Sequence, residues 1–306
     1  MRVGLTGSSG FIGAALVEAL RERGDEVVRF VRPESAAEGD TLIRWDPSRQ
    51  LVDDHDLARV SGLDAVVNLA GAGLADRRWS AARKEEIQRS RLDATTLLAS
   101  ALRAMSAGVA LVASGSAIGV YGSRGDELLD ESSSAGLDFL AQLCRSWEAA
   151  AAPLREQGAL VASLRTGIVM GGQGGVLKRQ LPLFRLGLGG PYASGRQWLS
   201  PISLRDEVRA ILWVIDHQVQ GPVNLVCPTP LTNADFAKNL ARALHRPAIV
   251  RIPAAVLKVA LGAQLTNEAV LASQRVLPHR LQESGFVFED PDSHSIISEV
   301  VRLRTN

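Results

Sequence analysis

Glycines spaced three residues apart follow a short apolar segment at the very start of the chain. Residues 2–5 are a candidate strand, and the segment from Thr6 to Gly13 places glycines at positions 7, 10 and 13 ahead of an apolar helical stretch. A strand, a tight glycine turn and a helix in this order form the first unit of a doubly wound sheet. Gly7 permits the turn, Gly10 leaves room for a pyrophosphate, and Gly13 lets the helix approach the sheet. The opening of the chain therefore predicts a dinucleotide site.

The residues of this turn are the candidate cofactor contacts. We assign that role to Gly7, Ser9, Gly10, Phe11, Ile12 and Gly13. The first turn of the following helix presents unpaired N–H groups, which favour a phosphate. A flexible turn is the alternative interpretation of any glycine triplet. The strand before it and the helix that stops at Gly24 favour the nucleotide site.

The end of the second predicted strand, residues 26–31, indicates which nucleotide is bound. In this fold an acidic residue there accepts a hydrogen bond from the ribose 2′-hydroxyl, whereas an arginine accommodates a 2′-phosphate. This chain has Arg32 and no acid at that point. A guanidinium pairs with phosphate through charge-assisted hydrogen bonds, so Arg32 favours NADP over NAD. The alternative is that Arg32 only solvates the end of a strand.

Composition restricts the class of protein. The 306 residues are 46% hydrophobic, which suits one large α/β domain with a smaller lobe, or two modest domains. The formal net charge of +1 predicts neither nucleic-acid nor membrane binding. The first strand begins at residue 2 and no stretch is long and apolar enough to span a bilayer, so we expect a cytoplasmic protein. These patterns do not decide the oligomeric state, and a homodimer stays open.

Cysteine and histidine usage predicts no metal site. Cys144 and Cys227 are the two cysteines, and neither a disulfide framework nor a ligand cluster follows from them. The five histidines show no paired spacing that suits zinc. We expect both cysteines to be core residues.

Short apolar strands alternate with amphipathic helices along the chain, which predicts a doubly wound parallel sheet of the α/β class. After the second strand, we expect strands over residues 42–46, 64–69, 109–113, 160–164 and 223–226, and helices over 79–105, 138–152, 233–244 and 253–261. Glycine-rich loops break this rhythm from Gly171 onward. We therefore assign residues 1–168 to the nucleotide-binding domain and residues 169–306 to a smaller substrate lobe, with the strand over 223–226 belonging to the sheet.

Small and polar residues follow two of the predicted inner strands, where nucleotides bind in such folds. Leu69, Ala70 and Gly71 come after one strand, and small residues there let a ribose and nicotinamide approach the backbone. A close-packed turn is the alternative. Ser114 and Ser116 end the next strand, and Tyr121 follows shortly after.

These motifs resemble a known family. The glycine turn, the segment from Asn68 to Gly71, the serine-rich strand end and the segment from Arg165 to Val169 look like those of extended short-chain dehydrogenases/reductases of the sugar-nucleotide epimerase type. The chain is most similar to an atypical branch, the uncharacterised epimerase family proteins with a C-terminal domain of unknown function. The motifs typical of that branch lie at residues 187–191, 195–198, 224–234 and 275–286.

The resemblance implies a proton-transferring pair that this chain lacks. In the superfamily, a serine works with a tyrosine four residues ahead of a lysine, and the lysine lowers the pKa of the tyrosine. No lysine occurs between Lys84 and Lys178, and Cys144 and aliphatic residues fall in the places of the pair. Arg145 would supply charge but cannot give up a proton. The candidate catalytic residues are therefore Ser114, Ser116 and, as a displaced acid, Tyr121, for which packing is the alternative.

Two further positions follow from the resemblance. Arg91 lies in a segment, Ser90 to Leu92, that resembles the branch's motif in the helix passing the nicotinamide half, so we assign it to cofactor binding, with a surface position as the alternative. The branch's usual Trp-x-His is replaced by Pro201 to Ser203. Ser203 and Asp206 form a capping box, which is the simplest explanation of that aspartate.

Two functions stay open on these grounds. The first is an NADP-dependent oxidoreductase or epimerase-like enzyme that acts on a small polar molecule. The second is a non-catalytic NADP(H)-binding sensor or interaction protein, which the loss of the tyrosine and lysine favours. Retention of Ser114, Ser116 and Tyr121 favours the first.

Overall fold

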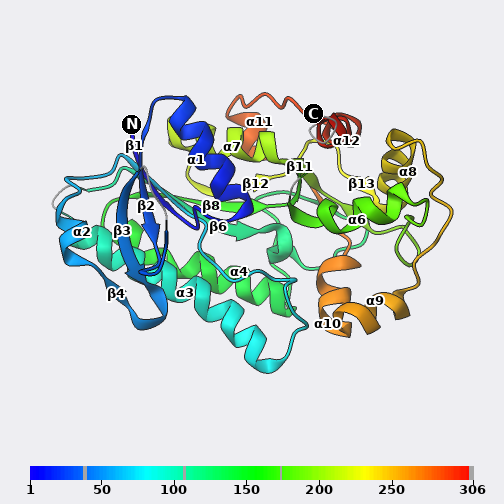
Figure 1. The fold of residues 1–306 in the computed structure, drawn as a ribbon, viewed down its shortest axis with the longest axis horizontal. Coiled ribbons are helices and arrows are strands. Elements are labelled where there is room, and N and C mark those ends of the chain that lie inside the picture. Colours follow the sequence, from blue (N-terminus) through cyan, green and yellow to red (C-terminus); the bar gives the residue numbers. More distant parts are fainter. Residues whose placement is uncertain (37–39, 106–107, 173, 303–306) are drawn as a thin grey trace.

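One twisted sheet of eight strands runs through the molecule (Figure 1). The computed structural model describes residues 1–36, 40–105, 108–172 and 174–302. In spatial order the strands are β12 (Gly221–Leu225), β8 (Leu160–Thr166), β6 (Leu111–Ala117), β5 (Ala65–Asn68), β1 (Arg2–Thr6), β2 (Glu26–Val31), β3 (Thr41–Asp46) and β4 (Leu51–Val52). All neighbours are parallel except β3 and β4. The expected doubly wound α/β sheet is confirmed.

The central strands are apolar because both of their faces are covered. In register, Val3 of β1 pairs with Ala65 of β5, and Ala65 pairs with Leu111 of β6. All three side chains are buried. Parallel strands covered on both faces read as continuous apolar runs, which is the pattern that made them recognisable.

Helices cover the two faces of the sheet (Figure 1). Residues of α1 (Phe11–Glu22) and α7 (Leu204–Asp216), such as Leu16 and Ile211, share one hydrophobic cluster with the sheet. On the opposite face lie α2 (Asp54–Ala58), α3 (Ala81–Ala104), α4 (Phe139–Ala150) and α5 (Ala152–Glu156). Leu98 of α3 packs there against Val66 and Val112. Helix–sheet–helix layering therefore positions the carboxyl ends of the strands along one edge.

The helix boundaries follow local capping. Ser80 accepts a hydrogen bond from the Arg83 N–H at 3.1 Å, which starts α3 two residues later than its apolar pattern begins. Asp138 caps α4 in the same way, through the Ala141 N–H at 2.8 Å. The expected box at the start of α8 (Asn233–Ala243) is confirmed, because Thr232 accepts from the N–H three residues ahead. Strand β6 runs to residue 117 and so includes both candidate serines.

The second half of the chain adds a smaller group of elements beside the sheet (Figure 1). Its helices are α6 (Gly175–Arg185), α8, α9 (Ala254–Leu261), α10 (Ala263–Leu265), the π-helix η3 (Thr266–Val270), α11 (His279–Glu283) and α12 (Ser293–Arg302). Short strand pairs join β7 (Leu128–Leu129) to β14 (Arg275–Val276), β9 (Ile168–Met170) to β11 (Pro201–Ser203) and β10 (Trp198–Leu199) to β13 (Leu231–Thr232). Leu177, Phe236 and Ile296 bring α6, α8 and α12 into one apolar cluster. The 3₁₀ helices are η1 (Pro47–Arg49) and η2 (Ile118–Tyr121).

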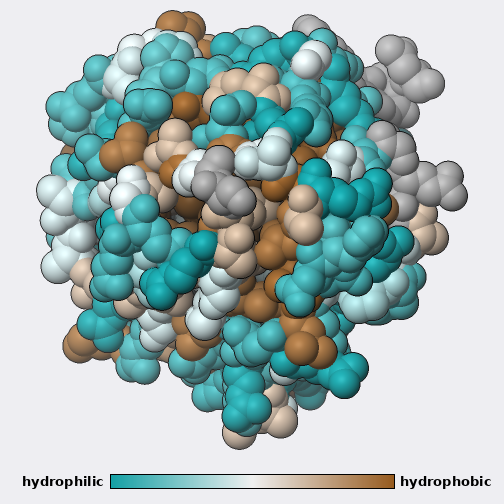
Figure 2. All heavy atoms as spheres, turned by 90° about the vertical axis from the view of Figure 1, so that its left-hand side faces the viewer, coloured by the Kyte–Doolittle hydropathy of each residue, from teal (hydrophilic) through white to brown (hydrophobic). Residues whose placement is uncertain are grey.

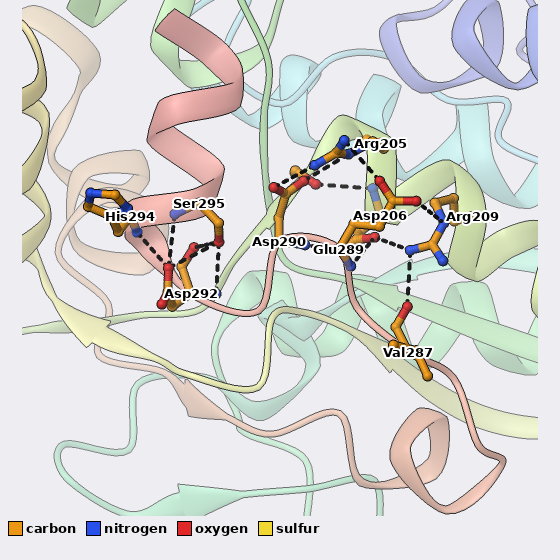
Figure 3. Close-up of polar contacts among 10 residues, drawn as sticks. Arg205, Asp206, Arg209, Val287, Glu289, Asp290, Asp292, His294 and Ser295 are labelled. Carbon is orange, nitrogen blue, oxygen red and sulfur yellow. Dashed lines mark hydrogen bonds and ion pairs between the residues drawn. The ribbon is translucent and has the colours of Figure 1, made fainter. Parts of the chain in front are cut away.

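A buried aspartate joins the start of α7 to the segment that precedes α12 (Figure 3). Ser203 accepts a hydrogen bond from the Asp206 N–H at 3.0 Å, so the expected capping box is confirmed. The Asp206 carboxylate is fully buried and accepts the N–H groups of Glu289 and Asp290 at 3.1 and 2.7 Å. Arg209 pairs with it at 2.6 Å. Asp206 thus anchors this segment, and its bonds explain it without a catalytic role.

Candidate functional site

The glycine turn after β1 has the shape that its spacing predicts. Gly7 has a φ of +68°, a conformation that residues with a Cβ rarely adopt. A Cβ there would lie 2.7 Å from the Leu69 carbonyl group, and a Cβ on Gly13 would collide with the Gly7 carbonyl oxygen. Both positions therefore require glycine for steric reasons internal to the protein.

Gly10 differs from its two partners because the space beside it is open. Among the described residues, a Cβ on Gly10 would approach only the Gly7 carbonyl oxygen, at 3.2 Å. Gly10 is also the N-cap of α1, which has no side-chain cap and no acidic residue in its first turn. The positive end of a 12-residue helix thus faces this space. The arrangement suits a phosphate group.

Phe11 has a role that the sequence did not reveal. Its ring lies against a glycine-rich segment of the second half of the chain, where a Cβ on Gly171 would come within 2.6 Å of the ring. A Cβ on Gly174 would overlap the ring. The glycines after β9 therefore make room for Phe11 and tie the turn to the smaller lobe. The signal was present in the glycine run, but nothing in the sequence identified its partner.

Arg29 lies in β2 and Arg32 directly follows that strand, whose end pairs with the end of β1. Arg32 follows the end of β2 and is exposed to solvent, and Ser9 in the turn is exposed as well. Arg29, inside β2, donates from Nε to the Ser8 hydroxyl at 3.0 Å and pairs with Asp40 at 3.3 Å. Arg29 was not among the predicted contacts, although a charged residue inside an apolar strand was a usable signal.

Buried hydrogen bonds hold the segment after β5 beside the turn. The Thr6 hydroxyl donates to Asn68 Oδ1 at 2.7 Å and accepts from the Ala70 N–H at 3.1 Å. Asn68 Nδ2 donates to Thr95 of α3 at 3.0 Å. The structure therefore brings Leu69, Ala70 and Gly71 together with the glycine turn at one edge of the sheet.

Arg91 is buried, so the alternative that it is a surface residue is wrong. Its side chain is next to Gly71, where a Cβ would lie 3.1 Å from the guanidinium carbon. Nη1 donates to the carbonyl oxygens of Ala72 and Ile87, both at 3.0 Å, and the guanidinium lies over the Trp147 ring at 4.9 Å. No ion pair of the described residues includes Arg91. Burial lowers the pKa of Arg91 to about 10, which leaves it a cation at neutral pH.

The two serines of β6 have different surroundings. The Ser114 hydroxyl is buried and has no hydrogen-bond partner within the described part of the chain. The Ser116 hydroxyl donates to Glu148 at 2.7 Å, and Glu148 receives two hydrogen bonds from Arg165, at 2.9 and 3.1 Å. Ser114 therefore has an unused hydrogen-bonding group in the described structure, whereas Ser116 is held by α4 and β8.

Tyr121 belongs to the interior. Its side chain is completely buried, and its hydroxyl donates to Asn224 at 2.7 Å and accepts from Arg165 Nη1 at 3.0 Å. Asn224 in turn donates to the Leu277 carbonyl oxygen at 2.9 Å. Burial raises the pKa of Tyr121 to about 12. The structure favours the packing interpretation and does not suit a phenol that exchanges a proton with substrate.

The helix position that carries tyrosine and lysine in the superfamily is apolar here. Leu140 and Cys144 of α4 are both buried. Burial raises the pKa of the Cys144 thiol to about 11, so the thiol is neutral near pH 7. Cys227 is likewise buried and unpaired, which confirms both cysteines as core residues.

A polar groove lies at the opposite, amino-terminal ends of β2 and β3. Figure 2 looks at this side of the molecule, where hydrophilic residues cover most of the surface and hydrophobic atoms gather towards the middle. Arg21 and Arg44 line the groove and pair with Asp40 and Asp56 at 2.5 and 3.0 Å. Because the groove lies at the amino-terminal ends of these strands, remote from the carboxyl edge, it is not the predicted nucleotide site.

Within residues 1–36, 40–105, 108–172 and 174–302, no three histidine, cysteine or acidic side chains gather where they would hold a metal ion. Over the same residues, no helix combines the length and the apolar character needed to cross a membrane.

Comparisons with known proteins place the chain in a family. Residues 3–226 match the NAD dependent epimerase/dehydratase family, and residues 252–300 match a domain of unknown function, DUF1731. Epimerase family protein Mb2239 of Mycobacterium bovis is 42% identical over 304 residues, covering 99% of this chain and 97% of that protein. Epimerase family protein SDR39U1 of Homo sapiens is 35% identical over 308 residues, covering 98% and 100%.

Solved structures agree with this match. The crystal structure of human epimerase family protein SDR39U1 (isoform 2) with NADPH is 32% identical, covers 99% of each chain and superposes with a TM-score of 0.87. UDP-N-acetylglucosamine 4-epimerase from Bacillus cereus is 17% identical with a TM-score of 0.78 and full coverage, which shows the shared fold alone. The expected resemblance is thus confirmed, and the chain belongs to the NAD dependent epimerase/dehydratase family, with DUF1731 as its C-terminal domain.

Proposed function

We propose that this protein binds NADP(H) at the carboxyl edge of its sheet and acts as an oxidoreductase or epimerase-like enzyme on a small polar molecule. The observation that supports the cofactor best is the glycine turn, in which Gly7 and Gly13 are sterically required while the space beside Gly10 is open. The pyrophosphate would lie there, on the N–H groups that start α1. The human relative crystallised with NADPH supports the same cofactor.

The remaining cofactor contacts follow the order of the strands. The 2′-phosphate would meet Arg32 after β2, and Arg29, bonded to Ser8 of the turn, adds positive charge nearby. Ser9, Phe11 and Ile12 would border the pyrophosphate. Leu69, Ala70 and Gly71 would border the nicotinamide half after β5, where Arg91 reaches the same edge from α3.

Bound NADPH would supply hydride to a substrate held between this edge and the smaller lobe. On the protein side, the hydroxyl of Ser114 is the one of the three candidates that is unpaired in the described structure. We therefore assign to it a hydrogen bond to a substrate oxygen. Ser116 is oriented by Glu148 and serves as a positioning residue. The Tyr121 hydroxyl already donates to Asn224 and accepts from Arg165, so we do not assign the proton transfer to Tyr121.

A non-catalytic role as an NADP(H)-binding sensor or interaction protein is the second candidate. The observation in its favour is the closure of the catalytic position: Leu140 and Cys144 replace the usual pair, and Tyr121 is fully engaged. A screen of NADPH oxidation over small aldehydes, ketones and keto acids separates the two. Turnover that falls with Ser114→Ala supports the enzyme, and NADPH binding without turnover of any compound supports the sensor.

The cofactor choice is tested by calorimetry with NADPH and NADH. We expect wild-type protein to prefer NADPH and Arg32→Ala to lose about 1.5 to 3 kcal/mol of NADPH binding while its NADH affinity is unchanged. Arg49→Ala is the matched control, because it removes a surface arginine of η1 rather than one beside the glycine turn. Equal affinity of wild-type protein for the two nucleotides would contradict the assignment.

We also propose that residues 1–168, with β12, form the nucleotide-binding part, that residues 169–306 form the substrate lobe, and that the protein works in the cytoplasm. Cell fractionation tests the location, and gel filtration decides between a monomer and a homodimer. Limited proteolysis with NADPH present tests the division, which predicts greater protection of the first part than of the second.

A further inference from the structure

Three side chains near the ends of β5 and β6 carry hydrogen-bond donors that have no protein partner among the described residues. Ser114 Oγ and Trp147 Nε1 are buried and unpaired within the described residues. Arg91, 8% exposed, uses Nη1 for both of its hydrogen bonds there, and these leave the donors on Nε and Nη2 free. Arg91 and Trp147 can only donate. The missing partner is therefore an acceptor.

The Arg91 and Trp147 side chains are in contact, and Ser114 lies on the strand against which Trp147 packs. The Arg91 guanidinium carbon lies 4.9 Å from the centre of the Trp147 ring. That ring packs where a Cβ on Gly115 would be 2.7 Å away, next to Ser114 in β6. Ser114 pairs in register with Asn68, whose amide bonds Thr95, one helical turn from Arg91.

Charge narrows the class of acceptor. A buried guanidinium is costly unless an anion or several hydrogen bonds compensate it. Arg91 has no carboxylate partner among the described residues, unlike Arg165 and Arg83, which pair with glutamates at 2.9 and 2.5 Å. A buried cation without a carboxylate partner, beside two unpaired donors, is suited to an anionic oxygen group.

The order of the strands indicates which ligand carries that group. Resting on the proposed function, the two anionic parts of NADP(H) lie at the turn after β1 and at Arg32 after β2. Arg91 touches Gly71 after β5, and Trp147 touches Gly115 of β6, on the other side of β1. The nicotinamide half that reaches this side carries no anion of its own.

We propose that Arg91, Trp147 and Ser114 form a subsite for an anionic oxygen group of the substrate, a carboxylate or a phosphate. The substrate class is then a small acid, held with its charged end against α3 and α4. The carbon that exchanges hydride lies between this end and the nicotinamide. Arg91 is a specificity residue in this assignment rather than a cofactor contact.

The test uses protein saturated with NADPH and titrates it by calorimetry with sodium malonate and, separately, with inorganic phosphate at constant ionic strength. We expect one of the two anions to bind, which distinguishes a carboxylate from a phosphate subsite. Arg91→Gln should weaken the binding of that anion about tenfold or more. Arg91→Lys should restore part of the loss. Arg89→Gln, an exposed position on the same helix, should change nothing.

Trp147→Phe and Ser114→Ala keep the packing and remove one hydrogen-bond donor each. Both variants should therefore bind the anion several-fold more weakly, with unchanged NADPH affinity. Ser114→Ala without ligand should melt no lower than wild type, because the hydroxyl has no protein partner to lose. The proposal is overturned if NADPH-loaded wild type binds neither anion, or if Arg91→Gln weakens NADPH instead. Failure of wild-type protein to bind NADPH at all would reject the proposed function before this step.

Discussion

The edge around the glycine turn and the region around Tyr121 lie on the same sheet but differ in how their polar groups are used. Beside Gly10 the space is open and the first turn of α1 has no side-chain cap. Around Tyr121, hydroxyl, amide and guanidinium groups bond one another, from Ser116 through Glu148 and Arg165 to Asn224. The two regions therefore differ in what they leave available: the turn leaves room for a phosphate, whereas the hydroxyl of Tyr121 is bonded to interior groups.

Filling the open space beside Gly10 should have the largest effect. Gly10→Val would place a branched side chain in the space proposed for the pyrophosphate, while the φ of −76° at this position suits any residue. We expect loss of measurable NADPH binding with a nearly unchanged melting temperature. Thermal melts with and without NADPH measure this, and Gly108→Val, whose Cβ would meet nothing within 4 Å, is the control. A ligand-induced shift as large as that of wild type would place the nucleotide elsewhere.

The stability of the fold should respond to pH through Glu207 of α7, which is fully buried and receives a hydrogen bond from Thr166 at 2.8 Å. Burial raises the pKa of Glu207 to about 8, so the folded state holds a proton that the unfolded state releases near pH 4.5. Its contribution to stability is full below about pH 4.5 and is lost as pH rises through about 8. Glu207→Gln should remove up to about 4 kcal/mol of this pH dependence. Urea unfolding of both proteins from pH 5 to 9 measures it, and parallel profiles would contradict it.

Breaking the Arg165–Glu148 ion pair beside Tyr121 should lower the free energy of unfolding without changing the site beside Gly10. Arg165→Met leaves Glu148 without its cation and Tyr121 without a donor, and we expect a loss of about 3 kcal/mol in the free energy of unfolding. Urea denaturation gives the loss, and NADPH calorimetry on the folded variant should give the wild-type affinity. The control is Arg89→Met, which breaks the exposed ion pair of Arg89 with Glu85. This variant should lose less than about 0.5 kcal/mol in the free energy of unfolding. A large drop in NADPH affinity would show that the two regions are coupled.

The smallest effect is expected at Tyr121 itself. Tyr121→Phe keeps the ring but removes one hydrogen bond each from Asn224 and Arg165. We expect a loss of about 1.5 kcal/mol in the free energy of unfolding. Turnover of any substrate that the screen finds should stay within about twofold of wild type, because the hydroxyl contacts interior groups alone. A loss of turnover with unchanged stability would return Tyr121 to the role of proton donor.

The parts of this protein that its sequence determined are those with a local cause. The glycine spacing predicted the turn, because φ and the Cβ contacts at Gly7 and Gly13 depend on the chain within a few residues or on the adjacent strand. Apolar runs predicted the strands, and capping residues such as Thr232 predicted where helices start. Arg32 and the segment from Leu69 to Gly71 were placed at the carboxyl edge by the same parallel topology.

Only the tertiary structure decided which polar groups are occupied. Tyr121 and Asn224 are about a hundred residues apart, and their bond exists because β6 and β12 flank β8. Arg91 sits in a helix rich in charge, and its burial depends on Trp147 from another helix covering it. A hydroxyl or guanidinium is left unpaired or not according to hydrogen-bond partners that come from segments far apart in the sequence. The local sequence therefore does not predict that pairing. The sequence thus determined where a nucleotide site would form, and the fold decided which side chains around it were left unpaired.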